Sequence, residues 1–392
     1  MLSQQICRKI LFSLLCLLGI TALTGCAPKS SRFGIVFINQ FADIYRIPDN
    51  TQNKVEQLTF TPTIGEYVKG ISKNGDKIIF STDFYSDSDM SPSELKIEQL
   101  RHVYLLDTTS KKLVDITNVL ENKYPQIGPE FYIDWSPNQK KFVVVTYEGG
   151  GYEIKSFLEF VDFDGTNRKD VLIPTTGEIP SLINGVKWSP DGKKFILTQG
   201  VIGFKQQQEN PGVALLVYDL ESGNLVQITD YMDGCFPSEW SPTNKQIVAI
   251  CMPTFPYMNE NASFLPETIR IFDVENPGKS YERIAFTSCD NPSWSPDGKQ
   301  IAFVCAKDKN YKGIFVVNSD GSGIHEIELG EVGNPTVLYS PIWSPDGTQI
   351  IYVAGSDYEH TNIYSKHLDN SSNRSLTNQD DFYHLLSVYS LP

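Results

Sequence analysis

The tryptophans of this sequence all occupy one position of a repeated motif. Each stands in a Trp-Ser-Pro triplet, at Trp135, Trp188, Trp240, Trp294 and Trp343. A turn-forming pair follows each triplet, and an apolar segment follows the turn. The copies recur about every 50 residues, a spacing typical of β-propellers, whose blades contain four strands each. The repeat constrains the fold more tightly than any other feature of the chain.

Each repeat contains four short segments with the character of β-strands, which we name A, B, C and D in chain order. Strand A ends at the tryptophan. Strand B comes after the turn and is apolar at consecutive positions, as at Ile301–Val304. A strand that is buried on both faces has this pattern. The inner strands of a propeller blade are buried in this way, because each blade is packed between two others.

The ends of the chain determine how many blades we expect. Two degenerate copies of the motif have Ile71 and Tyr389 at the position of the tryptophan. Segments for strands B, C and D precede the first strand A, and one strand A follows the last strand D. Joined, they form one shared blade and leave no open sheet edge. The sequence therefore predicts an all-β propeller of seven four-stranded blades over residues 33–392, with six blades and ragged ends as the alternative.

The N-terminus has the features of an export signal. Arg8 and Lys9 precede an apolar run at 10–23, which is shorter than the ~20 residues of a spanning helix. The ending Leu-Thr-Gly-Cys resembles the lipobox of bacterial lipoproteins, which implies a signal peptide at 1–25, a lipidated Cys26 and a linker at 26–32. Two acyl chains anchor a protein stably. A plain signal peptide or a signal anchor is the alternative.

The repeat itself resembles that of TolB-type propellers. The resemblance rests on Trp-Ser-Pro-Asp-Gly-Lys and on the closing Gln57-Leu58-Thr59 and Ser375-Leu376-Thr377, and it covers residues 33–392. It implies either a periplasmic interaction protein or a non-catalytic propeller like those of prolyl-oligopeptidase-type peptidases. TolB itself has six blades and a separate N-terminal domain, so the resemblance specifies architecture more closely than function.

Composition and motifs point away from several functions. The formal charge of −14 argues against nucleic-acid binding, which needs clustered lysine and arginine. The sequence contains no Gly-x-Ser-x-Gly nucleophile motif and no histidine or cysteine spacing typical of a metal site. We therefore expect no cofactor and no metal. These motifs leave open whether the protein is an enzyme, and they favour a protein without catalytic activity.

Four cysteines outside the N-terminal region form two equivalent pairs. Cys235 and Cys251 flank one A–B turn, and Cys289 and Cys305 flank the next. Their midpoints fall within the turns, so each pair is expected to lie directly opposite across a hairpin, at a Cα separation that a disulfide accepts. An exported protein reaches an oxidising compartment. We predict the bridges Cys235–Cys251 and Cys289–Cys305, with four free thiols as the alternative.

Two groups of residues are candidates for binding. The residue before the tryptophan is Asp134, Lys187, Glu239 or Ser293 in four successive repeats, so three of the four are charged. This position is expected to line the central channel, where the side chains could bind a ligand or form hydrogen bonds between blades. The second group lies in long B–C connections, which leave one face of a propeller. Its aromatic and acidic members are Phe84, Tyr85, Asp87, Phe255, Tyr257 and Phe264. Such loops on a rigid scaffold suit recognition, and tolerated insertion is the alternative.

These observations support two hypotheses. The first is a membrane-anchored, non-catalytic propeller lipoprotein, exported to the periplasm or cell exterior, that binds a protein or peptide partner in the cell envelope. The second is a propeller that binds or acts on carbohydrate through the carboxylates of its channel.

The predicted disulfides can be checked by alkylation and intact-mass measurement of the mature protein. Without reductant, we expect no alkylation of the four propeller cysteines, because oxidised sulfur is not a nucleophile. With reductant, all four should be modified. Alkylation of all four without reductant would contradict the pairing.

Overall fold

A computed structural model describes most of the chain after residue 31. The described residues are 32–39, 43–51, 54–59, 64–84, 103–116, 132–149, 154–162, 167–174, 181–201, 212–252, 268–277, 280–285, 287–306, 312–332, 335–369, 373–377 and 383–391. The chain divides into two compact units, 1–31 and 32–392. The predicted signal peptide and Cys26 lie outside the described residues, and the description below concerns the second unit alone.

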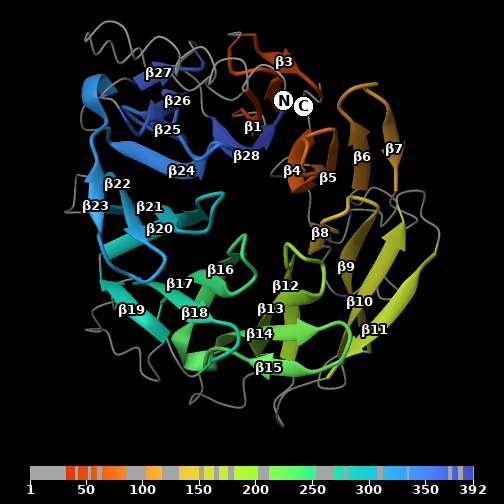
Figure 1. Ribbon diagram of the computed structural model, residues 1–392. Coiled ribbons are helices and arrows are strands. Elements are labelled where there is room, and N and C mark those ends of the chain that lie inside the picture. Colours follow the sequence, from red (N-terminus) through yellow and green to blue (C-terminus); the bar gives the residue numbers. More distant parts are fainter. Residues whose placement is uncertain are drawn as a thin grey trace, which may run out of the picture. The chain divides into compact units, whose positions relative to one another are not determined.

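Seven four-stranded antiparallel sheets follow one another around a ring in the described residues, and each is one blade (Figure 1). The innermost strands, A, are β4 (Ile64–Ile71), β8 (Ile133–Trp135), β12 (Ser181–Trp188), β16 (Cys235–Trp240), β20 (Thr287–Trp294), β24 (Val337–Trp343) and β28 (His384–Ser390). The B strands are β1 (Phe33–Ile38), β5 (Lys77–Phe84), β9 (Lys141–Glu148), β13 (Lys194–Val201), β17 (Gln246–Cys251), β21 (Gln300–Ala306) and β25 (Gln349–Gly355).

The outer half of each blade completes the architecture. The C strands are β2 (Ile44–Ile47), β6 (Val103–Asp107), β10 (Lys155–Asp162), β14 (Val213–Asp219), β18 (Thr268–Asp273), β22 (Lys312–Asn318) and β26 (Thr361–His367). The D strands are β3 (Glu56–Gln57), β7 (Leu113–Asp115), β11 (Lys169–Ile173), β15 (Leu225–Gln227), β19 (Ser280–Ala285), β23 (His325–Ile327) and β27 (Asn373–Ser375). Two short 3-10 helices, η4 (Tyr231–Asp233) and η5 (Gly330–Val332), lie between blades. We number the blades from 1 (β28, β1, β2, β3) to 7 (β24 to β27).

Blade 1 is built from both ends of the described chain. Strand β28 pairs antiparallel with β1, from Phe33 opposite Ser390 to Ile38 opposite His384. This pairing confirms the predicted closure and decides in favour of seven blades over six. It also covers the edge of β1, which would otherwise be open to pairing with another chain.

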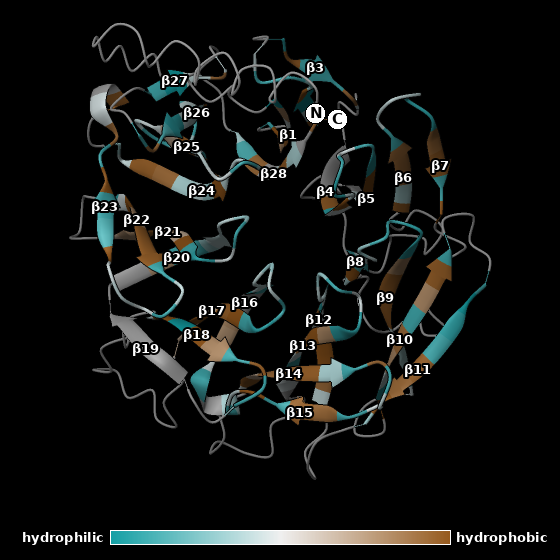
Figure 2. Ribbon diagram, viewed as in Figure 1, coloured by the Kyte–Doolittle hydropathy of each residue, from teal (hydrophilic) through white to brown (hydrophobic). Residues whose placement is uncertain are grey.

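The core lies between the blades rather than at the centre of the ring. One cluster joins Val248 and Ile269 of blade 5 to Trp294 and Phe303 of blade 6. B strands are buried along almost their whole length, as predicted from their consecutive apolar residues. Figure 2 shows this distribution, with hydrophobic residues on strands such as β22 and β24 and hydrophilic residues on outer strands such as β3 and β27.

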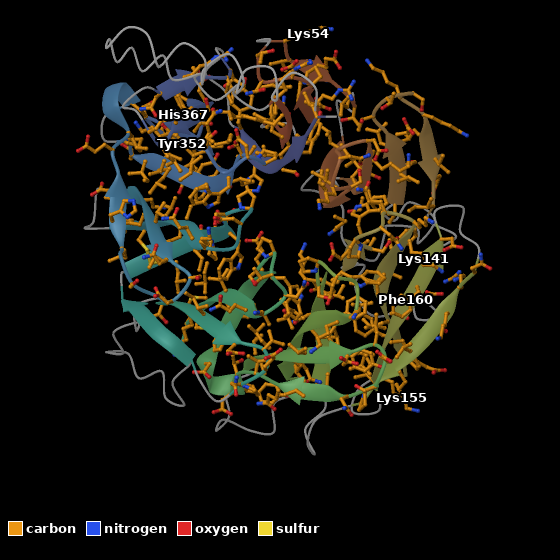
Figure 3. The ribbon with its side chains drawn as sticks, in the orientation of Figure 1. Lys54, Lys141, Lys155, Phe160, Tyr352 and His367 are labelled. Carbon is orange, nitrogen blue, oxygen red and sulfur yellow. A yellow bond between two sulfur atoms is a disulfide. The ribbon has the colours of Figure 1, made fainter. Side chains whose placement is uncertain are left out.

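The tryptophans pack at these junctions between blades. Each of the five ends an A strand, as the repeat predicted, and Ile71 ends β4 in the same position. Phe160 of blade 3 (labelled in Figure 3) meets the ring of Trp188 in blade 4 edge to face, with the ring centroids 5.7 Å apart. Aromatic pairs of this geometry contribute more than the area they bury.

The rest of the motif forms the A–B turn. The Ser295 N–H donates to the Gln300 carbonyl at 2.8 Å, and the Ser295 hydroxyl donates to Asp297 at 2.8 Å. Proline suits the next position, because its ring fixes φ near the value that a type I turn requires. The turn ends with a left-handed residue, which is Gly298 here (φ 69°), and Gln139 and Asn244 take that conformation in blades 3 and 5. Glycine is common there because it has no Cβ to clash.

Both predicted cysteine pairs lie within blades. Cys235 stands opposite Cys251 across β16 and β17, and Cys289 opposite Cys305 across β20 and β21. The Cα separations are 3.9 Å and 4.0 Å, and each pair is bonded through sulfur. The predicted pairing is confirmed. Each bridge ties an A strand to its own B strand, in two neighbouring blades.

The ring closure makes a prediction about stability. Tyr389 of β28 is buried against Gly34 of β1 and Gly75 of the β4–β5 turn. Replacing it with alanine leaves a cavity where blade 1 meets blade 2, so Tyr389→Ala should lower the free energy of unfolding by about 3–5 kcal/mol. Urea denaturation checks this value. Tyr358→Ala removes a tyrosine that is 63% exposed and should change stability by less than about 0.5 kcal/mol. Equal effects of the two changes would contradict the proposed importance of closure.

Candidate functional site

The residue before each tryptophan lies on an innermost strand, as predicted. We call the seven equivalent residues the axial ring: Gly70, Asp134, Lys187, Glu239, Ser293, Ile342 and Val388. The innermost strands surround the centre of the propeller (Figure 1). The ring is therefore charged over blades 3 to 5 and small or apolar over the other four.

Asp134 connects blade 3 to blade 4. Its Oδ2 accepts a hydrogen bond from the backbone N–H of Trp188 at 2.6 Å. The ammonium of Lys187, on the same strand as Trp188, lies 3.9 Å from the other carboxylate oxygen. Burial raises the pKa of Asp134, and the Lys187 charge and backbone N–H groups oppose this effect.

Glu239 repeats this arrangement between blades 5 and 6. Its Oε2 accepts a hydrogen bond from the backbone N–H of Trp294 at 3.1 Å. The indole of Trp294 donates in turn to the Glu239 carbonyl at 3.3 Å. Burial raises the pKa of Glu239 to about 7, against the opposing effects of the Trp294 N–H and the Lys187 charge. Part of the side chain is nevertheless exposed to water, so we expect a smaller effect on stability than a fully enclosed carboxyl would have.

The indole hydrogen bonds recur around this side of the ring. Trp240 donates to the Lys187 carbonyl at 3.2 Å, and Trp343 donates to the Ser293 carbonyl at 3.1 Å. Of the two roles foreseen for the axial residues, the geometry places Asp134 and Glu239 in bonding between blades. The Lys187 side chain differs from both carboxylates, because 58% of it is exposed and its ammonium group can only donate hydrogen bonds.

The structure describes little of the predicted binding face. Phe84 ends β5, and its side chain lies outside the described residues. Tyr85, Asp87, Phe255, Tyr257 and Phe264 also lie outside them. The strands that bound these connections are described. Because neighbouring strands are antiparallel, every B–C connection leaves the same face as the starts of the A strands.

One B–C connection on this face is fully described, and the sequence did not single it out. The hairpin between β25 and β26 carries Tyr358 at its tip, 63% exposed. Asp357 fixes the hairpin by accepting the N–H groups of Glu359 and His360, both at 2.9 Å, and the His360 Nδ1 at 2.7 Å. An aspartate that accepts hydrogen bonds from backbone N–H groups two and three residues further along the chain is a recognisable turn signal. This connection is short, from Gly355 to Thr361, whereas the B–C connections predicted to bind stand out in the sequence by their length.

The described residues contain no group of three or more histidine, cysteine, aspartate or glutamate side chains that could hold a metal ion. Within the same part of the chain, no helix has the length and apolar character needed to cross a membrane.

Comparison with known proteins identifies the fold. No family model and no curated protein matches the chain. The β-propeller domain of the trilobed protease from Pyrococcus furiosus is 12% identical, with a TM-score of 0.55 over 89% of this chain and 95% of that one. Puromycin hydrolase is also 12% identical, with a TM-score of 0.56 over 90% of this chain and 54% of that one. TolB from Acinetobacter baumannii is 16% identical, with a TM-score of 0.44 over 89% of this chain and 80% of that one.

The two matches with TM-scores above 0.5 show a shared fold and nothing finer. This chain spans about half the length of puromycin hydrolase. The propeller from the trilobed protease has an open velcro topology. The present ring is closed by hydrogen bonds between β28 and β1.

The position of Glu239 predicts a dependence of stability on pH. Since the folded protein raises the pKa of Glu239 to about 7, its folded state retains a proton that the unfolded chain releases near the ordinary value of 4.5. The contribution of Glu239 to the free energy of unfolding is therefore fully present below pH 4.5. It is lost as the pH rises from 4.5 toward 7. The stability of Glu239→Gln should therefore fall less between pH 4.5 and 7.5 than that of the unmodified protein. Urea titrations across this range measure the difference.

Lys187→Gln gives a second, opposite test. It removes a charge that lowers the pKa of Glu239, so the loss of stability should move to higher pH. Parallel curves for all three proteins would show that Glu239 does not titrate differently in the folded state.

Proposed function

We propose that this protein is a membrane-anchored lipoprotein whose non-catalytic propeller binds a protein or peptide partner in the cell envelope. The observation that carries the proposal is the concentration of long connections at one face. The chain between β5 and β6 runs from Phe84 to Val103, between β13 and β14 from Val201 to Val213, and between β17 and β18 from Cys251 to Thr268. The A–B turns at the other face are short and alike.

The anchoring part of the proposal rests on the N-terminal sequence. Leu23-Thr24-Gly25-Cys26 has the order of a lipobox, and lipid on Cys26 would tether the propeller through the 26–32 linker. The disulfides of blades 5 and 6 support export, because such bonds persist in oxidising compartments. We expect the propeller to face the periplasm or the cell exterior.

The carbohydrate hypothesis loses its main support. It required the carboxylates of Asp134 and Glu239 to be available to a ligand, and both accept backbone hydrogen bonds from the next blade. A carboxylate in this role cannot turn to a ligand without giving up the hydrogen bond that it accepts from the backbone N–H of the next blade. Binding of a partner at the face of the B–C connections leaves these hydrogen bonds between blades intact.

Crosslinking in intact cells tests the proposal. The full-length protein should fractionate with membranes and capture a partner. Cys26→Ser should lose both the lipid mass and the membrane association. The triple change Phe255→Ser, Tyr257→Ser and Phe264→Ser should abolish capture, because aromatic side chains contribute most to binding at interfaces.

A matched control uses exposed apolar residues on the outer strands. Leu113→Ser, Leu172→Ser and Val226→Ser alter three such residues on β7, β11 and β15, which are 50%, 50% and 42% exposed. This triple variant should capture the partner normally. If the two triple variants behave alike, the partner does not bind through the B–C connections.

A further inference from the structure

Two rings stack at the point where blade 7 meets blade 1. Tyr339 of β24 and His384 of β28 have ring centroids 5.9 Å apart and an interplanar angle of 23°. Both lie near the start of an A strand, and so at the face of the B–C connections. The Tyr339 hydroxyl donates to the Tyr383 carbonyl, which fixes the ring in place. Burial raises the pKa of Tyr339 to about 12, so this hydroxyl keeps its proton at neutral pH.

The imidazole of His384 is half-buried and neutral at neutral pH. Burial lowers its pKa below the ordinary value, and the nearby negative charge of Asp290 opposes this effect. Within the described ranges, no hydrogen bond from its ring nitrogens is present. The stacked pair therefore offers an uncharged aromatic surface beside a carboxylate.

Asp290 occupies in blade 6 the position that Tyr339 occupies in blade 7. Each stands four residues before the tryptophan of its blade and directly before an irregularity in strand pairing. The next residues, Asn291 and Ser340, have left-handed backbones, with φ of 48° and 53°. Irregularities of this kind turn a side chain away from the regular sheet pattern.

The carboxylate of Asp290 is available for a cation. The residue is exposed and accepts the N–H of Asn291 at 2.9 Å. Across the described part of the chain, Asp290 forms no ion pair. It is thus a negative charge near the His384 ring, without a positive partner among the residues that the structure describes.

The Tyr358 hairpin adjoins the same position. Gly355, at its base, pairs with Val337 at the start of β24. On the other side of the hairpin, the Thr361 hydroxyl accepts the N–H of Tyr383, the residue before His384. The hydroxyl of Tyr358 is near enough to influence Tyr339 electrostatically. An exposed ring on a fixed hairpin therefore lies next to the stacked pair.

We infer that Asp290, Tyr339, His384 and Tyr358 form a subsite for an arginine side chain of a peptide partner. A guanidinium stacks on aromatic faces and pairs with a carboxylate at its edge, and this cluster supplies both. The surroundings favour a cation, since Asp357 and Glu359 of the hairpin are also exposed and the chain carries a formal charge of −14. The inference deepens the proposed function by naming the chemistry of the partner.

Peptide titration of the full-length protein, purified in detergent, tests the subsite. The probe is the acetylated and amidated peptide Gly-Ser-Arg-Ser-Gly, and its control replaces arginine with citrulline, which has the same shape without the charge. NMR titration should show binding of the arginine peptide at least about fivefold tighter than that of the citrulline peptide. Equal binding of the two, or binding of neither, would overturn the inference.

Substitutions identify the residues that bind. Asp290→Asn should weaken binding of the arginine peptide about tenfold and leave the citrulline peptide unchanged, because a charge-assisted bond is lost. Tyr358→Ala should weaken binding of the arginine peptide about threefold. Tyr358→Phe should bind that peptide as the unmodified protein does, since the ring face is retained. Glu275→Gln, an exposed carboxylate after β18 at the opposite face, should have no effect. An Asp290→Asn variant that binds normally would place the site elsewhere.

The two proposals fail separately. If crosslinking captures a partner through the B–C connections but the arginine peptide does not bind, the partner is recognised by other chemistry and the subsite is wrong. If the arginine peptide binds through Asp290 but no envelope partner is captured, the subsite stands and the proposed function is wrong.

Discussion

No blade of this propeller can bury its inner strands alone, so every blade depends on both of its neighbours. Strand β1 illustrates the constraint. Ile35 and Phe37 pack against Ile351 and Val353 of blade 7, whereas Val36 packs against blade 2. A strand with apolar residues on both faces is stable only when both are covered. The ring must therefore close, and β28 closes it from the far end of the chain.

The repeated tryptophan motif solves the same problem at each junction. Its serine, proline and glycine build a turn that brings strand B back beside strand A, and its indole packs against the preceding blade. In three described junctions the indole also donates to the carbonyl of that blade's axial residue. Asp134 and Glu239 reinforce two junctions by accepting a tryptophan N–H. Residues that looked like a ligand site from their charge are thus part of the scaffold.

A scaffold that uses its axial charges for assembly leaves recognition to its surface. The A–B turns are short and fixed by their own hydrogen bonds, so they vary little among blades. The opposite face is free to vary, since a connection between strands B and C can lengthen without disturbing the packing between blades. The aromatic and acidic residues proposed to bind a partner all belong to that face or to the starts of the strands beneath it.

The repeat in the sequence predicts seven blades, the places of the tryptophans and the partners of the four cysteines, while the pairing of β28 with β1 and the two bonded cysteine pairs exclude the alternatives. These properties depend on local hairpins whose spacing repeats, so position in the motif fixes position in space. The bonding of Asp134 and Glu239 to the next blade depends on tertiary packing, since a carboxylate on an inner strand can reach either the centre or its neighbour. Tertiary packing alone brought together Asp290, Tyr339 and His384, which come from three blades. Each is about 50 residues from the next, and their proximity follows from the curvature of the ring, which no local pattern encodes.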